Sequence, residues 1–300
     1  MSKPIVRGIF VPVVTPFDVH GEVALEHFQA NAKKWLRLGL SGLVVTGSTG
    51  EAVSLDIDER TRLWEAARAL IPTDRLLIAG TGAESTRATI ALTKRAAEAG
   101  ADLALIGTPS YFHPFMTVEA LTAHYRAVAD AAPIPVVLYN IPRFTRVEMS
   151  AAVVVELSRH PNIIGIKDSS GNVGLVGQIA ARTADDFATV TGSGATLFPA
   201  LMVGAVGGIL AAANIAPAQY IEIVRLCEAG EYAAARALQA RLIPVSNLIA
   251  ARMGPAGVKA GLDMLGYYGG PVRPPLLPVS DSDRAVLRAT LAEAELIHDA

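Results

Sequence analysis

The chain has 300 residues, of which 51% are hydrophobic and 18% charged, and its formal net charge is −2. This composition can build a sizeable core, and it shows no basic excess for nucleic-acid binding and no acidic tail. Cys227 is the only cysteine, so no internal disulfide can form, and we expect a reducing, cytoplasmic environment. The first residues show no signal-peptide pattern, because their apolar run is short and is broken by Pro12.

Eight short apolar runs, rich in β-branched residues, are typical of strands. They are GIFVPVV (8–14), GLVVTG (42–47), LLIAGTG (76–82), DLALIG (102–107), IPVVLYN (134–140), NIIGIK (162–167), FATVTG (187–192) and VGGILAA (206–212). Helical patterns separate most of them, at 24–39, 58–71, 86–100, 117–132 and 150–160. Strands that are apolar on both faces predict a parallel sheet covered by helices. Eight such units predict an α/β fold of the (β/α)₈ TIM-barrel type rather than an open sheet, and no GxGxxG follows the first strand.

Four helical patterns follow the last strand, at 217–230, 231–250, 254–266 and 281–300. We expect a barrel that carries the active site at 1–225 and a C-terminal helical domain at 226–300. The longest apolar run, 198–216, is about long enough for a membrane helix. Pro199, Asn214 and three glycines in this run instead predict a helix, a strand and a loop in the protein core.

Polar side chains follow several of the predicted strands. Chemistry in such barrels lies at the C-terminal ends of the strands. Lys167 ends the sixth strand and Tyr139 ends the fifth. Hydroxyl-bearing residues follow the second, fourth and seventh strands, and they are Ser48, Thr49, Thr108, Tyr111 and Ser193. We therefore expect hydroxyls and one amine to gather at one mouth of the barrel.

Lys167 is the only one of six lysines at a strand end. The others lie near the terminus or in helical patterns, where a surface position is expected; they are Lys3, Lys33, Lys34, Lys94 and Lys259. A lysine in an apolar pocket holds more free amine, which can attack a ketone and form a Schiff base. The alternative is a structural lysine paired with a buried carboxylate, such as Asp168 or Glu51.

Tyr139 and the segment GSTGE (47–51) each have two interpretations. Tyr139 can transfer protons, or it can be a packed aromatic ring whose hydroxyl is merely satisfied. GSTGE can be a simple turn, or its backbone N–H groups and the hydroxyls of Ser48 and Thr49 can hold a carboxylate. The six histidines show no metal-ligand spacing and GxSxG is absent, so we expect neither a metal nor another cofactor.

Three motifs occur in order: VTGSTGE (45–51), PVVLYNIP (135–142) and IIGIKDSSGN (163–172). Together they resemble the dihydrodipicolinate synthase/N-acetylneuraminate lyase family. The resemblance extends over essentially the whole chain, including GAVGGILAAAN (204–214) and GYYGGPVRPPLLPVS (266–280). It implies a class I pyruvate aldolase, built on a (β/α)₈ barrel with a C-terminal helical domain and assembled as a homotetramer.

The resemblance also implies roles at the reacting centre. Lys167 matches the Schiff-base lysine, and Tyr139 matches the proton-transfer tyrosine. Ser48 and Thr49 match the pair that binds the carboxylate of pyruvate, with Ser48 also in the proton relay. The imine would act as the electron sink for making or breaking the C3–C4 bond.

Four further site residues are implied by the resemblance. Tyr111 matches a tyrosine that reaches into the neighbouring subunit's site in several family members. Ser169 matches a serine that lines the site two residues after the lysine. Gly192 and Ile209, on the seventh and eighth strands, are expected to contact the substrate.

The substrate depends on positions that vary within the family. Dihydrodipicolinate synthases carry an arginine five residues after the tyrosine, where this chain has Phe144 preceded by Arg143. Neighbouring loop residues usually point in different directions, so we expect Arg143 not to substitute, which disfavours aspartate-semialdehyde. Ser193 and Gly194 stand where neuraminate lyases carry acidic residues, which disfavours a sialic acid.

The combination of KDSSG (167–171), GSGATLFPALMVGAVGGILAAAN (192–214) and YYGGPVRPPL (267–276) most resembles 4-hydroxy-2-oxoglutarate aldolases. This resemblance implies that the partners are small molecules, namely pyruvate and a small aldehyde such as glyoxylate. A dihydrodipicolinate synthase is the first alternative, and a 2-keto-3-deoxy sugar-acid aldolase or dehydratase is the second. A pyruvate-binding or structural protein that has lost its activity is the alternative outside enzymes.

Overall fold

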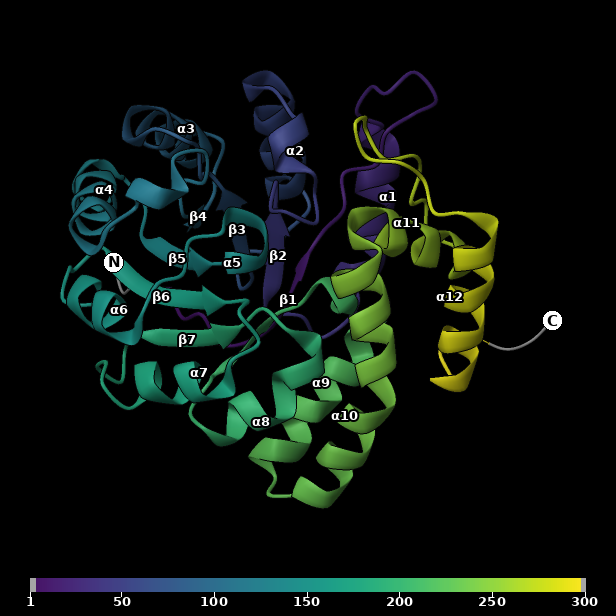
Figure 1. Cartoon of the computed structure of the whole chain (residues 1–300). Helices are drawn as coiled ribbons and strands as arrows, with labels where there is room; N and C mark the ends of the chain where they lie inside the picture. Colours follow the sequence, from purple (N-terminus) through teal and green to yellow (C-terminus); the bar gives the residue numbers. More distant parts are fainter. Residues whose placement is uncertain (1–3, 298–300) are drawn as a thin grey trace.

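The computed structural model describes residues 4–297 and contains a closed barrel of eight parallel strands in chain order (Figure 1). The strands are β1 (Gly8–Pro12), β2 (Gly42–Val45), β3 (Leu76–Gly80), β4 (Leu103–Gly107), β5 (Val136–Asn140), β6 (Ile163–Asp168), β7 (Ala188–Thr191) and β8 (Gly207–Ile209). Each strand overlaps the apolar run that predicted it. The predicted (β/α)₈ TIM barrel is confirmed.

Helices surround the strands (Figure 1). They are α1 (Leu25–Leu36), α2 (Ile57–Arg68), α3 (Thr86–Glu98), α4 (Val118–Ala131), α6 (Ala151–Leu157), α7 (Val173–Ala180), α8 (Leu197–Met202) and α9 (Pro217–Glu228). Asp56, Ser85 and Thr117 begin α2, α3 and α4, and each side chain accepts a hydrogen bond from a backbone N–H of the first turn. Such caps satisfy donors that the helix itself leaves free.

The chain after α9 forms three more helices, of which α10 packs against α9, and α12 packs against both α10 and α11 (Figure 1). These are α10 (Tyr232–Ser246), α11 (Gly254–Met264) and α12 (Asp281–Glu293), and a π-helical turn, η5 (Asn247–Arg252), joins α10 to α11. Pro244 lies inside α10, where it cannot donate a backbone hydrogen bond, and the regular helix ends two residues later. The expected domain boundary after residue 225 falls within α9.

The long apolar run at 198–216 forms most of α8, the strand β8 and a 3₁₀ turn, η4 (Ala211–Asn214). Helix, strand and loop therefore follow one another as the sequence predicts. No helix within residues 4–297 is both long enough and apolar enough to span a bilayer.

The interior of the barrel is filled by side chains from many of the strands. This inner cluster consists of Val6, Phe10, Val44, Ile78, Leu103, Leu105, Val137, Tyr139, Ile141, Ile164, Val190 and Ile209. A packed interior leaves no channel through the barrel. It forms a hydrophobic floor under the C-terminal ends of the strands, where polar side chains can gather above it.

Candidate active site

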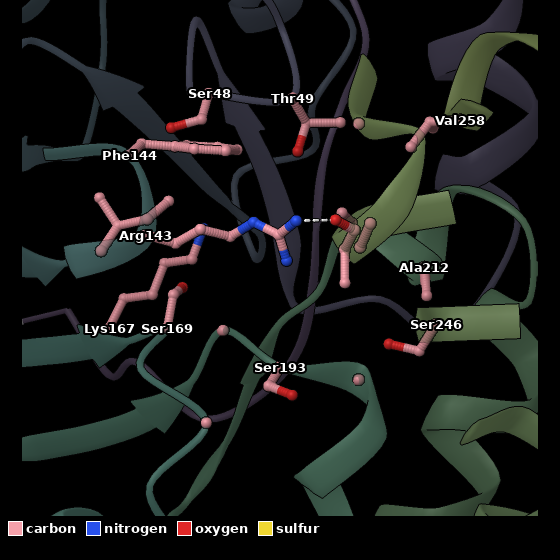
Figure 2. A pocket seen from close by; sticks show the side chains of 18 of the residues that line it. Ser48, Thr49, Arg143, Phe144, Lys167, Ser169, Ser193, Ala212, Ser246 and Val258 are labelled. Atoms are coloured by element: carbon pink, nitrogen blue, oxygen red, sulfur yellow. Dashed lines mark hydrogen bonds between the residues drawn. The ribbon is translucent and has the colours of Figure 1, made fainter. Parts of the chain in front are cut away.

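A cavity of about 280 Å³ opens at the C-terminal ends of the strands (Figure 2). The predicted site residues that line it are Ser48, Thr49, Tyr139, Lys167, Ser169, Gly192 and Ser193. In Figure 2, Ser48 and Thr49 lie on one side of the cavity and Lys167 and Ser169 on another. The structure therefore brings together residues from β2, β5, β6 and β7 that are far apart in the sequence.

Strand pairing places Lys167 beside Tyr139. The two residues are register partners on β6 and β5. Lys167 is 5% exposed and Tyr139 6% exposed, and the Lys167 Nζ atom lies 4.1 Å from the centroid of the Tyr139 ring. The amine is thus largely removed from water and rests against an aromatic face.

Neither carboxylate that could have paired with Lys167 does so. Asp168 accepts hydrogen bonds from Asn140 Nδ2 at 2.7 Å and from the Ser170 hydroxyl at 2.6 Å. Glu51 is paired with a different lysine, Lys259, at 2.5 Å. Within residues 4–297 no ion pair involves Lys167, so the interpretation as a lysine held by a buried carboxylate is wrong.

Ser48 connects the carboxylate-binding segment with Tyr139. The Ser48 Oγ atom lies 3.5 Å from the Tyr139 hydroxyl, at the long limit of a hydrogen bond. The loop that carries Ser48 is flanked by two residues with left-handed backbone, Thr46 (φ 58°) and Glu51 (φ 54°). Trp64 fixes the first of these, because its Nε1 donates to the Thr46 hydroxyl at 2.7 Å.

Gly192 is at a position in the cavity wall that has no room for a side chain. A Cβ atom there would lie 1.8 Å from the Ser169 Oγ and 3.0 Å from the Lys167 Cε. A methyl group would displace both side chains. The absence of a side chain at the end of β7 therefore keeps the space around the amine open.

Two predicted site residues lie elsewhere. Ile209 is fully buried in the floor of the barrel, below the cavity. Tyr111 is 78% exposed, and its ring packs edge-on against Phe112 rather than lining the cavity.

Arg143 lies in the cavity wall, contrary to the expected direction of its side chain. Arg143 and Phe144 both line the cavity. They sit in a helical turn, α5 (Pro142–Thr145), where successive side chains are about 100° apart and can share one wall. The Arg143 side chain extends across the cavity and its Nη2 donates to the carbonyl oxygen of Ala251 (Figure 2).

The C-terminal helices supply a wall that the sequence reasoning missed. The contributing residues are Ser246, Asn247, Ala250, Ala251, Gly254, Pro255 and Val258. Pro244, inside a helical pattern, is the one signal in the sequence of a break at this point.

Lys259 was expected at the surface, and that expectation is wrong. Its side chain is 2% exposed and bonded to Glu51. The neighbours of Lys259 along α11 are small or apolar, for example Val258, Ala260 and Leu262, which is the pattern of a buried helix.

The cavity combines a buried amine, a phenol against it and a serine within reach of the phenol. Such an arrangement can form an imine with a ketone and move protons beside it. No carboxylate is among the cavity-lining residues of the described chain. Residues 4–297 also contain no group of three or more His, Cys, Asp or Glu side chains placed to hold a metal ion.

Comparison with known proteins agrees with this geometry. The model of the dihydrodipicolinate synthetase family matches residues 5–294. The chain belongs to this family. It is a class I pyruvate aldolase, that is, a carbon–carbon lyase.

Relatives within the family carry two different names. A 4-hydroxy-tetrahydrodipicolinate synthase from Methanothrix thermoacetophila is 38% identical over 288 residues, which cover 96% of each chain. A probable mitochondrial 4-hydroxy-2-oxoglutarate aldolase from Emericella nidulans is 37% identical over 298 residues, covering 98% of this chain and 96% of the relative. The two names denote different reactions within the family.

Solved structures of dihydrodipicolinate synthases share the fold. The chloride-inhibited enzyme from Acinetobacter baumannii, complexed with pyruvate, superposes with a TM-score of 0.93 at 34% identity, covering 97% of this chain and 100% of that one. DapA-2 from Bacillus anthracis superposes with a TM-score of 0.92 at 34% identity, covering 96% of this chain and 99% of that one.

Proposed function

We propose that the protein cleaves 4-hydroxy-2-oxo acids through a Schiff base at Lys167, with 4-hydroxy-2-oxoglutarate as the preferred substrate and pyruvate and glyoxylate as products. The observation that carries this proposal is an unpaired, buried amine in a cavity that also holds a guanidinium and several hydroxyls but no carboxylate. Pyruvate bound to the Acinetobacter baumannii neighbour supports a 2-oxo acid as the ligand.

The reaction begins when the Lys167 amine attacks the C2 ketone, and loss of water gives an iminium. Tyr139 takes the proton of the C4 hydroxyl, the C3–C4 bond breaks, and its electron pair moves into the iminium to form an enamine. Glyoxylate leaves. The enamine is then protonated at C3, and water hydrolyses the resulting iminium to pyruvate and the free amine. Ser48 passes the proton to and from Tyr139, which its Oγ approaches at 3.5 Å.

Two groups of residues hold the ends of the substrate. Ser48 and Thr49 hold the C1 carboxylate and so fix the ketone beside the amine. Arg143 binds the distal C5 carboxylate in place of the Ala251 carbonyl, because a charged acceptor makes the stronger hydrogen bond.

The remaining predicted site residues determine the shape of the cavity. Ser169 lines the substrate chain, Gly192 leaves room for it, and Ile209 supports the floor below. We further propose that residues 1–225 carry the reacting groups, whereas 226–300 close one wall.

The competing candidate is a 4-hydroxy-tetrahydrodipicolinate synthase, the name that several relatives carry. Its substrate, aspartate-semialdehyde, has a carboxylate that Arg143 can bind, so the position of Arg143 does not separate the two activities. The same substrate also carries an ammonium group, and no carboxylate lines the cavity that holds Lys167. Glu51 and Glu84 line an adjoining cavity, where Glu51 is paired with Lys259 and Glu84 accepts hydrogen bonds from Ser110 and Tyr111. An unpaired buried charge is costly, and this cost favours the dicarboxylate without an amine.

The test compares kcat/KM for cleavage of 4-hydroxy-2-oxoglutarate with kcat/KM for condensation of aspartate-semialdehyde with pyruvate. We expect the first to be at least ~10²-fold higher, about 2.7 kcal/mol, the size of one unsatisfied charged group. Equal or higher efficiency with aspartate-semialdehyde would make the protein a dihydrodipicolinate synthase.

Two variants refine the assignment of the distal carboxylate. Arg143→Ala should raise KM for 4-hydroxy-2-oxoglutarate roughly 10- to 100-fold and leave the half-saturating pyruvate concentration unchanged. Arg146→Ala is the matched control, because Arg146 ends the same helical turn at the surface and does not line the cavity. A similar rise in KM for both variants would argue against a specific contact with Arg143.

We also propose a cytoplasmic homotetramer in which Tyr111 reaches a neighbouring subunit's cavity. The exposed cluster of Tyr111, Phe112 and Phe115 near the mouth of the barrel supports this arrangement, since large exposed aromatic patches are typical of interfaces. Light scattering of the purified protein tests the assembly. A monomer that is fully active would rule out a shared site.

A further inference from the structure

Glu51 and Lys259 form an ion pair that is hidden from solvent and takes no part in the proposed reaction. The Lys259 Nζ lies 2.5 Å from the Glu51 Oε1, and the two side chains are 2% and 1% exposed. Lys259 also donates to the carbonyl oxygen of Pro271 at 2.7 Å. The second oxygen of Glu51 accepts the backbone N–H of Arg273 at 2.9 Å.

The pair is enclosed by the segment GYYGGPVR (266–273), part of a family motif that the reaction itself does not use. A Cβ at Gly269 would lie 2.1 Å from the carbonyl oxygen of Lys259, so the segment lies directly on α11. Two basic side chains lie over the Phe17 ring, with the ring centroid 4.4 Å from the Lys259 Nζ and 4.3 Å from the Arg273 Cζ. The segment 266–273 and α11 therefore form one packed unit around the pair.

Glu51 connects this packed unit to the loop that carries Ser48 and Thr49. The backbone N–H of Glu51 donates to the carbonyl oxygen of Ser48 at 3.1 Å. Glu51 also has left-handed backbone, with φ of 54°. A residue other than glycine holds this conformation only when its surroundings fix it, and the two bonds to the Glu51 carboxylate provide that constraint.

Stability is a weak reason for such a pair. A buried ion pair loses its hydration, and well-packed apolar side chains of similar volume are often at least as stable. A charged pair does, however, hold both partners in one geometry through directional bonds. The residue whose geometry is fixed in this way is Glu51, which ends the carboxylate-binding loop.

We infer that Glu51 and Lys259 are positioning residues, through which α11 and the segment 266–273 hold Ser48 and Thr49 in the geometry that binds the carboxylate of the 2-oxo acid. This inference rests on the proposed function, in which those two hydroxyls receive that carboxylate. It gives the C-terminal helices a second role besides forming the cavity wall, namely to set the affinity for pyruvate.

The test measures two quantities in each variant: the pyruvate concentration that gives half-maximal borohydride trapping at Lys167, and kcat for cleavage at saturating substrate. In Glu51→Gln only one carbonyl oxygen remains to serve both Lys259 and the Arg273 N–H. We expect half-saturation to rise about tenfold, the effect of one lost hydrogen bond, with kcat within about threefold of wild type. Lys259→Met, which leaves the Glu51 charge unpaired, should raise the half-saturating pyruvate concentration further.

Asp102→Asn is the matched control. It removes the charge opposite Arg68, an ion pair of 2.9 Å at the N-terminal end of β4, on the far side of the barrel. The control should lower the melting temperature without changing half-saturation. An unchanged half-saturation in Glu51→Gln, or a rise in all variants in proportion to lost stability, would overturn the positioning role. If wild-type protein is not trapped by pyruvate at any concentration, the proposed function itself falls and takes this inference with it.

Discussion

Lys167 and Lys259 show that the chemistry open to a buried amine depends on the residues around it. Both lie over an aromatic ring, with the nitrogen 4.1 Å from the Tyr139 centroid and 4.4 Å from that of Phe17. Burial lowers the pKa of Lys259, and the Glu51 carboxylate 2.5 Å away opposes this shift by stabilising the ammonium form. Lys167 has no ion-pair partner in residues 4–297 and faces a cavity. Of these two buried lysines, only Lys167 is both accessible to a ketone and free of a carboxylate.

Tyr139 provides the sharpest test at the scale of a single residue. Tyr139→Phe keeps the ring that packs against Lys167 and removes the hydroxyl that approaches Ser48. If this hydroxyl carries the proton, kcat for cleavage should fall by roughly 10²–10⁴-fold. Steady-state kinetics measure the effect. A fall of less than about threefold would instead indicate a packed aromatic ring without a part in proton transfer.

Residue identities could be predicted from the sequence better than side-chain directions. Lys167 and Tyr139 were identified because each ends an apolar run, and parallel strands bring such ends together. Arg143 was placed wrongly because the sequence does not reveal that PRFT forms a helical turn. Lys259 was placed wrongly because its partner, Glu51, is 208 positions away in the chain (259 − 51), and no local pattern indicates such a contact.

At the scale of elements, the ends of β5 and β6 are tied together by Asn140. Its Nδ2 donates to the Asp168 carboxylate at 2.7 Å, and its carbonyl oxygen accepts the Ser169 N–H at 2.8 Å. Its side-chain oxygen also accepts the N–H of Met149 at 3.0 Å. These bonds fix the register that places Tyr139 beside Lys167.

Asn140→Ala should therefore affect stability and activity together. It leaves the buried Asp168 carboxylate without one donor, which should lower the free energy of unfolding by about 2–3 kcal/mol and kcat/KM by about tenfold. Urea denaturation and kinetics measure the two effects. Ser280→Ala, which removes the N-cap of α12 away from the cavity, should cost about 1 kcal/mol and leave kcat/KM unchanged. Unaltered kcat/KM in Asn140→Ala would show that the tie does not control the site.

Strands were predicted more completely than the short helices. Apolar β-branched runs indicated all eight strands, because both faces of a barrel strand are buried. Helix α7 was not predicted, because its sequence VGLVGQIA lacks the polar face of an amphipathic helix. The first four residues of the π-helical turn η5, NLIA, were predicted as the end of an ordinary helix, since they do not differ from a helical pattern.

At the scale of the whole molecule, ion pairs fasten the C-terminal segment to the barrel helices. Arg273 donates to both carboxylate oxygens of Glu59 on α2, at 2.6 and 2.8 Å. The bonds from Arg273 hold the pKa of the Glu59 carboxyl below its ordinary value of 4.5. The folded state therefore favours the charged form of Glu59 more than the unfolded state does.

This pairing predicts a contribution to stability that disappears in acid. Because the pKa is lowered on folding, the contribution is complete above about pH 4.5 and is lost as the pH falls through the folded-state pKa. Glu59→Gln should lower the free energy of unfolding by roughly 1–3 kcal/mol at neutral pH, and the difference from wild type should shrink as the pH falls below about 4.5. Urea titrations at several pH values measure it. A difference that stays constant with pH would exclude an electrostatic origin.

The most direct test of the account as a whole is the location of the covalent bond to pyruvate. Treating the protein with pyruvate and borohydride, and mapping the adduct by mass spectrometry, should give a reduced adduct at Lys167 and none at the other buried lysine, Lys259. Lys167→Ala should abolish both the adduct and turnover. An adduct at another lysine, or no adduct under conditions that trap a known class I aldolase, would contradict the assignment of Lys167 as the nucleophile.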